Sequence, residues 1–204
     1  YGPKVVARAP RTAASLRGAR VAIPGEGTTA FLVTSLLVGP GSFHAEAVPF
    51  KEIPARVAAG EFDAGVVIHE GQLTFERDGL VLVEDLGRWW RAETGLPLPL
   101  GANGVLRALD DRHGPGTMAE VAGLLARSIR HALDHRAESV RYAMQFAEGM
   151  TEELADRFIS MYVNAWTLDF GPVGRRAVGT LLGRAADAGL LPRVREPDFV
   201  GGAP

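Results

Sequence analysis

The sequence contains no cysteine among its 204 residues. Without thiols the chain can form no disulfide, thiolate zinc site, iron-sulfur cluster or cysteine nucleophile. It also has no apolar run near the roughly 20 residues needed to cross a bilayer, and its opening segment has no long apolar stretch like that of a signal peptide. We therefore expect a cytoplasmic protein that does not enter a membrane.

An excess of charge of one sign is also missing, because the net charge is -2 at pH 7 and the pI is near 6.2. This balance provides no general attraction to nucleic acid or to an anionic membrane. The chain is 47% hydrophobic and 23% charged. Such a composition supports a globular core in one or two domains and favours a small molecule as the partner. The oligomeric state stays open.

The first half of the sequence alternates short apolar runs with helical patterns. Strands are expected at residues 4–7, 20–23, 45–48, 64–68 and 80–86, with helices after Thr28, over 51–59 and over 87–94. The run 64–68 is apolar on both faces, which suits the centre of a parallel sheet. Pro97 and Pro99 indicate an extended connection. From Thr117 the pattern is helical, so the fold class is α/β with a mainly parallel sheet and a helical C-terminal part.

His69 directly follows the buried run 64–68. In open α/β sheets, ligands bind beyond the carboxyl ends of the strands. An imidazole at that position can accept and return a proton near neutral pH, which makes His69 a candidate general base. A histidine that only hydrogen-bonds a loop is the alternative. The neighbouring Glu70 points the opposite way on an extended backbone and is interpreted as structural.

The loop from Gly25 to Ala30 joins a strand end to a helix start. Free backbone N–H groups and the positive end of the helix dipole favour an anion there, and a carboxylate is the obvious ligand. N-capping of the helix by Thr28 is the alternative and, from the residues alone, the better-supported one. The loop lacks the Gly-Lys-Ser/Thr ending of a P-loop.

Other polar and aromatic residues support weaker hypotheses. His131 and His135 are four residues apart on an expected helix, so they form either a two-histidine metal face or, as we expect, a solvated face. The pair Asp110-Asp111 is expected to serve turn and capping chemistry. Trp89 and Trp90 are expected to pack in the core. A further group either lines a ligand site or serves packing and capping: Tyr162, Asn164 and Trp166.

Four segments together resemble the 1,4-dihydroxy-6-naphthoate synthases, in the same order. They are VAIPGEGTTA, FDAGVVIHEGQLTF, DLGRWWRAETGLPLPLG and MYVNAWTLDFGPVGRRAV. The resemblance implies a type 2 periplasmic-binding-protein fold, in which two α/β lobes enclose a ligand cleft. Members of the family carry an additional N-terminal portion. Residues 1–15 are therefore expected to be the remainder of the first lobe, 16–98 the second lobe, and 99–204 the return crossing and helices packing on the first lobe.

The same resemblance implies site residues and a reaction. The family's proposed base corresponds to His69, and its substrate-contacting stretch corresponds to Thr28, Thr29 and Ala30. The reaction converts cyclic dehypoxanthine futalosine to 1,4-dihydroxy-6-naphthoate in menaquinone biosynthesis by carbon-carbon cleavage. No metal or other cofactor is implied. The competing hypotheses are a non-catalytic solute-binding protein for a small anion, the sibling chorismate dehydratase, and the effector domain of a regulator, for which no DNA-binding head is visible.

Overall fold

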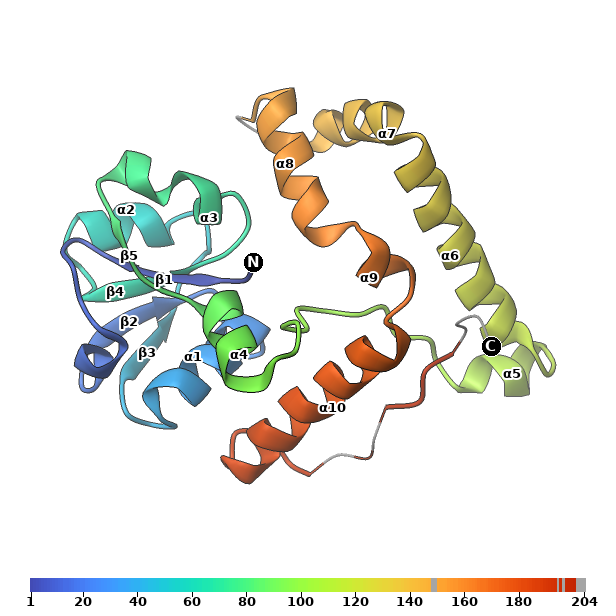
Figure 1. Ribbon diagram of the computed structural model, residues 1–204, viewed down its shortest axis with the longest axis horizontal. Coiled ribbons are helices and arrows are strands. Elements are labelled where there is room, and N and C mark those ends of the chain that lie inside the picture. The colour runs from blue at the N-terminus through green and yellow to red at the C-terminus, as the bar shows by residue number, and fades with distance from the viewer. Residues whose placement is uncertain (148–149, 194, 196, 201–204) are drawn as a thin grey trace. The chain divides into compact units, whose positions relative to one another are not determined.

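The computed structural model describes residues 1–147, 150–193, 195 and 197–200. The chain forms two compact units. The first consists of Tyr1–Gly101 with Arg176–Arg195, and the second contains Ala102–Arg175. Figure 1 shows the strands gathered in the first unit, whereas the second unit is built from helices. No helix among the described residues is both long and apolar enough to cross a membrane.

Five strands of the first unit form one sheet in the order β3-β2-β4-β1-β5. Their bounds are β1 Lys4–Ala7, β2 Arg20–Ile23, β3 His44–Ala47, β4 Ala64–Val67 and β5 Val81–Asp85. β2 is parallel to β3 and to β4, whereas β1 is antiparallel to β4 and to β5. As a result β2, β3, β4 and β5 all end at one edge of the sheet, and β1 begins there.

The expectation of a mainly parallel sheet therefore needs one correction, because β1 runs against both of its neighbours. The alternation of side chains across a strand is the same in either direction, so the residues KVVA carry no signal of polarity. The other strands lie within one residue of their expected ends. Pro97 and Pro99 lie in a stretch without regular structure, as expected.

Helices cover both faces of the sheet. They are α1 Thr29–Val38, α2 Ile53–Ala58, α3 Gly71–Thr74, α4 Leu86–Thr94 and α10 Gly171–Asp187, with short 3-10 turns η1 Ala13–Leu16 and η2 Phe75–Asp78. Alternate strand residues separate into two apolar clusters. Val5, Val21 and Val66 share one cluster with residues of α1, α4 and α10, whereas Val6 and Val67 share the other with residues of α2 and η2. This period of two is the pattern of strands buried on both faces, as β1, β2 and β4 are, whereas the edge strand β3 is exposed.

Gly65 in the centre of β4 allows α2 to approach the sheet closely. A Cβ atom at this position would lie 2.6 Å from Cγ2 of Ile53 and 2.7 Å from Cγ2 of Val57. Both of those side chains are fully buried. The missing side chain is therefore a packing requirement of this layer.

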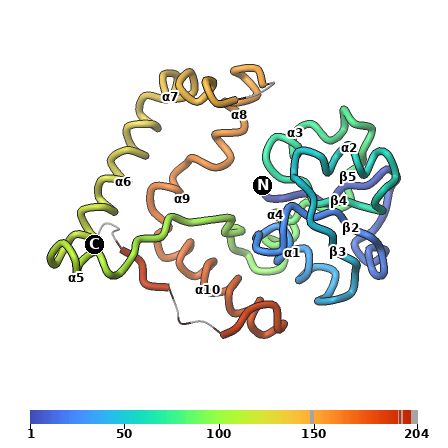
Figure 2. The backbone as a smooth tube through the Cα atoms, turned by 180° about the vertical axis from the view of Figure 1, so that it is seen from behind, coloured from blue at the N-terminus to red at the C-terminus, as the bar shows by residue number. Residues whose placement is uncertain are grey.

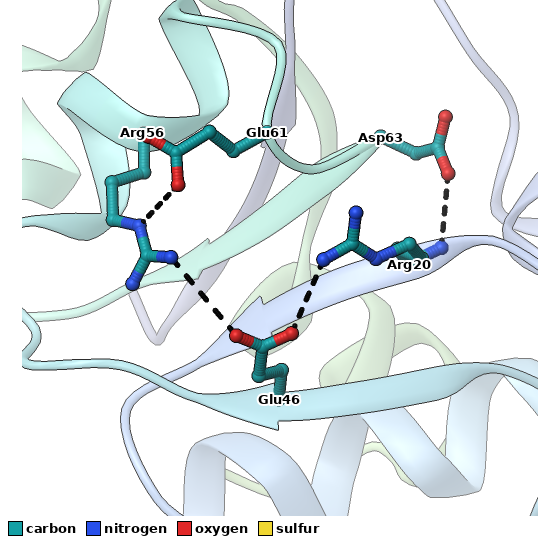
Figure 3. A network of polar contacts seen from close by, with 5 residues as sticks. All are labelled: Arg20, Glu46, Arg56, Glu61 and Asp63. Atoms are coloured by element: carbon teal, nitrogen blue, oxygen red, sulfur yellow. Dashed lines mark hydrogen bonds and ion pairs between the residues drawn. The ribbon is translucent and has the colours of Figure 1, made fainter.

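A network of polar contacts joins Arg20, Glu46, Arg56, Glu61 and Asp63 (Figure 3). Arg20 and Arg56 both contact Glu46, at 3.3 Å and 4.0 Å, and their guanidinium groups also lie over the Phe62 ring. Arg56 contacts Glu61 at 2.7 Å. That hydrogen bond raises the pKa of the Arg56 guanidinium above its ordinary value. Pairs this exposed contribute little stability individually.

The second unit is built from helices, and side chains cap the starts of some of them. Their bounds are α5 Ala108–His113, α6 Thr117–Asp134, α7 Arg136–Ala143, η3 Met144–Phe146, α8 Glu152–Tyr162 and α9 Ala165–Leu168. Thr151 caps α8, and Asn164 forms a capping box with Thr167 at the start of α9. The carboxylate of Asp110 accepts the backbone N–H of Met118 in the first turn of α6, at 2.8 Å. The capping interpretation is thus confirmed for Asp110 and Asn164, whereas helix α5 was not expected.

Candidate active site

The candidate site lies at the edge of the sheet where β2, β3 and β4 end. Pairing of Ala22 with Gly65 and of Ile23 with Ala47 aligns the ends of these three parallel strands. The loops that leave them contain the residues singled out from the sequence. Lys4 at the start of β1 reaches the same edge, where it lies opposite Val67 and Asp85. Figures 1 and 2 both show the N-terminus at this edge, close to α3.

His69 follows the last residues of β4 with an unusual backbone conformation. Its φ of 52° is the one positive φ recorded for a residue other than glycine in the described part of the chain. The side chain is exposed. Histidine is enriched among residues that adopt this left-handed conformation, which is nevertheless uncommon and clusters at functional sites. The imidazole therefore lies just beyond the carboxyl end of β4, where a ligand can reach it.

The chain reverses immediately after His69. The carbonyl of His69 accepts the N–H of Gln72 at 3.2 Å, and the carbonyl of Glu70 accepts the N–H of Leu73 at 2.8 Å. The Lys4 ammonium donates to the carbonyl of Gln72 at 2.9 Å and lies over the ring of Phe75. Strand β1 is thereby bonded to the short helix that follows the histidine.

An aromatic ring lies against the imidazole. The ring centroids of Phe50 and His69 are 4.6 Å apart, and their planes are inclined by 38°. Phe50 comes from the loop after β3 and is partly buried. The distance falls in the range of attractive aromatic pairs.

Thr28, Thr29 and Ala30 form the start of α1 at the same edge. The Thr28 hydroxyl donates to the carbonyl of Gly25 at 2.7 Å and accepts the N–H of Phe31 at 3.2 Å, so N-capping by Thr28 is confirmed. The Thr29 hydroxyl donates to the carbonyl of Leu100 at 3.0 Å. As the first residues of a helix, Thr29 and Ala30 have no carbonyl acceptor four residues earlier within it. Their N–H groups suit an anionic or polar oxygen.

The four expected site residues therefore lie at the same edge of the sheet. They are His69, Thr28, Thr29 and Ala30. The histidine supplies a group that can exchange a proton, and the helix start supplies donors that can orient an oxygen-rich ligand. Phe50 and Lys4 also contact residues at this edge, and sequence reasoning missed both. Periodicity carried no signal for either, since the contact of Phe50 joins two loops and the bond of Lys4 joins a strand to a distant turn.

The remaining candidates lie elsewhere. His131 and His135 are both exposed on α6 and at its end, with stacked rings 4.1 Å apart. Trp90 is fully buried and its indole N–H donates to the carbonyl of Pro97, whereas Trp89 is partly exposed. Among residues 1–147 and the later described stretches, no cluster of three or more metal-binding side chains of the His, Cys, Asp or Glu type occurs.

Two curated proteins resemble the chain over almost all of its length. A 1,4-dihydroxy-6-naphthoate synthase of Thermus thermophilus is 42% identical over 199 residues, which are 98% of this chain and 70% of the relative. A second protein of that name, from Streptomyces coelicolor, is 40% identical over 195 residues, covering 94% of this chain and 67% of the relative. The chain thus spans about two thirds of each relative's length.

Solved structures support the same relationship at the level of the fold. A crystal structure of an Archaeoglobus fulgidus protein matches 94% of this chain and 69% of its own, with a TM-score of 0.80 and 36% identity. The ligand-binding component of an ABC-type import system of Staphylococcus aureus covers 98% of this chain and 68% of its own, with a TM-score of 0.65 at 16% identity. The expected α/β fold of the periplasmic-binding-protein type is confirmed. A family model described as menaquinone biosynthesis matches residues 1–187, and with these relatives it shows that the chain belongs to the menaquinone biosynthesis family that includes the 1,4-dihydroxy-6-naphthoate synthases.

Proposed function

We propose that the chain carries the activity of a 1,4-dihydroxy-6-naphthoate synthase, a carbon-carbon lyase that acts on cyclic dehypoxanthine futalosine. The observation that supports this most is the 40% and 42% identity to two synthases over nearly the whole chain. A small molecule is then the substrate. Cytoplasmic localisation stays a prediction, as do the lobe boundaries after residues 15 and 98.

His69 is the proposed general base. The imidazole accepts the proton of a substrate hydroxyl, the electron pair of that O–H bond forms a carbonyl, and the adjacent carbon-carbon bond breaks. The electrons of the broken bond enter the ring system, which becomes aromatic and so drives the cleavage forward. Exposure of the side chain and its place beyond the carboxyl end of β4 support this role.

The start of α1 is the proposed contact for an anionic or polyol part of the substrate. The Thr28 hydroxyl already donates to Gly25 and accepts from Phe31, so its main contribution is to hold the helix start. The backbone N–H groups of Thr29 and Ala30 are therefore the donors that we assign to the substrate.

Turnover of cyclic dehypoxanthine futalosine by the parent protein and by His69→Asn tests this function. Asparagine tolerates the positive φ of position 69 but cannot act as a base at neutral pH, so it separates chemistry from folding. We expect the variant to bind substrate and to lose roughly 10²-fold or more in kcat. Full activity of His69→Asn would refute the base assignment.

A non-catalytic solute-binding protein remains the second candidate, because proteins of that class share the fold. Binding of the substrate by the parent without any product would favour this candidate. Turnover of chorismate instead of the futalosine derivative would assign the chain to the sibling dehydratase reaction.

A further inference from the structure

We infer that Phe50 is a positioning residue that holds the His69 imidazole in one orientation for proton transfer. This inference rests on the proposed function, in which His69 is the base. Phe50 makes no proposed contact with the substrate. It acts through the histidine.

The contact between the two rings is direct. Their centroids lie 4.6 Å apart with planes inclined by 38°, so the phenyl ring covers one side of the imidazole. Aromatic pairs at this distance attract each other beyond the effect of the apolar area that they bury. Such an attraction favours the imidazole rotamer that keeps the contact over its competitors.

The imidazole needs such support because His69 is exposed. Exposed side chains change rotamer on the picosecond to nanosecond time scale unless neighbours restrain them. The left-handed backbone turns the residue out of the line of β4. The ring of Phe50, which comes from another loop, packs against the imidazole.

Phe50 is well suited to this role, because the backbone is held in place both before and after it. Val48 is 3% exposed, and its N–H donates to the carbonyl of Ile23 at 2.9 Å. The carbonyl of Pro49 accepts the N–H of Glu52 at 2.8 Å, which closes a tight turn around Phe50. Ile53, the first residue of α2, is fully buried. The backbone that carries Phe50 is therefore anchored on both sides of the residue.

Orientation of the base affects the rate more than the affinity. Misplacing a reacting group by about 1 Å can lower a rate by roughly 10²-fold, whereas substrate contacts at the helix start are unaffected. Removal of the Phe50 ring should therefore lower kcat and leave KM nearly unchanged.

The experiment compares Phe50→Leu, Phe50→Tyr and the control Phe62→Leu in steady-state turnover of cyclic dehypoxanthine futalosine. Phe62 is buried two residues before β4 and lies under the guanidinium of Arg20, the first residue of β2, so it is at the opposite edge of the sheet from the site. We expect kcat to fall about 10-fold in Phe50→Leu at unchanged KM, and to return to within about 3-fold of the parent in Phe50→Tyr, which keeps the ring. Phe62→Leu should keep the parent kcat.

Two further measurements separate this inference from the proposed function. In a His69→Asn background, Phe50→Leu should lower the residual rate no further, because the residue acts through the imidazole. In NMR spectra, the ring protons of His69 should lose their upfield displacement in Phe50→Leu and keep it in Phe50→Tyr.

Each outcome has one meaning. An unchanged kcat in Phe50→Leu, with activity still dependent on His69, overturns the positioning role alone. A further loss in the His69→Asn background also overturns it, because Phe50 would then act independently of the base. Absence of turnover in the parent, or full activity of His69→Asn, overturns the proposed function and this inference together.

Discussion

At the scale of single residues, the backbone of position 69 is the least ordinary feature of the site. A φ of 52° is unfavourable for an alanine by about 1–2 kcal/mol, whereas asparagine adopts it more easily through local hydrogen bonds of its side chain. We expect His69→Ala to be less stable than His69→Asn by about 1 kcal/mol in urea unfolding. Equal stabilities of the two variants would show that the positive φ at position 69 does not favour asparagine over alanine.

Gly65 gives a second prediction at this scale. An added methyl group would lie 2.6 Å from Ile53 and 2.7 Å from Val57, so Gly65→Ala should lower the free energy of unfolding by about 1–3 kcal/mol.

The matched control for Gly65 is Gly183→Ala, in the interior of α10. Apart from its chain neighbours and the backbone of its own helix, no described atom lies within 4 Å of the Cβ that this substitution adds. Alanine should stabilise that helix by about 1 kcal/mol because glycine loses more backbone entropy there. Chemical denaturation of both variants tests the contrast, and a destabilised Gly183→Ala would contradict it.

At the scale of elements, the start of α1 depends on the hydroxyl of Thr28. Because that hydroxyl bonds both Gly25 and Phe31, Thr28→Ala should destabilise the protein by about 1 kcal/mol, and Thr28→Ser should retain most of that stability. Thermal unfolding measures the difference. A serine variant as unstable as the alanine variant would indicate that the methyl group, rather than the hydroxyl, matters here.

At the scale of the whole molecule, the two units differ in their cores. The fully buried residues of the sheet include Val5, Val21 and Val66, whereas Val140 and Ala155 are the buried apolar residues recorded among the described parts of the second unit, Ala102–Arg175. Amide protons of β1, β2 and β4 should therefore exchange only on global unfolding, and those of α6 and α7 through local opening at lower free energy. Hydrogen-exchange mass spectrometry tests this order, and uniform protection would refute it.

Most helices and strands of this protein, and the place of His69 after a buried strand, follow from local signals in the sequence. Apolar runs and a Thr N-cap are local signals, because they reflect how nearby residues meet water and the backbone. The family motifs supplied the candidate chemistry. Helix α5 is six residues long, which is too short to show a helical period in the sequence.

Three other features depend on the folded arrangement of the chain. It set the direction of β1, since side-chain alternation does not encode strand polarity. It joined Phe50 to His69 and Lys4 to Gln72, which lie 19 and 68 residues apart in the chain. Contacts between distant loops arise when strands align their ends at one edge of a sheet, and no local pattern of residues contains that alignment.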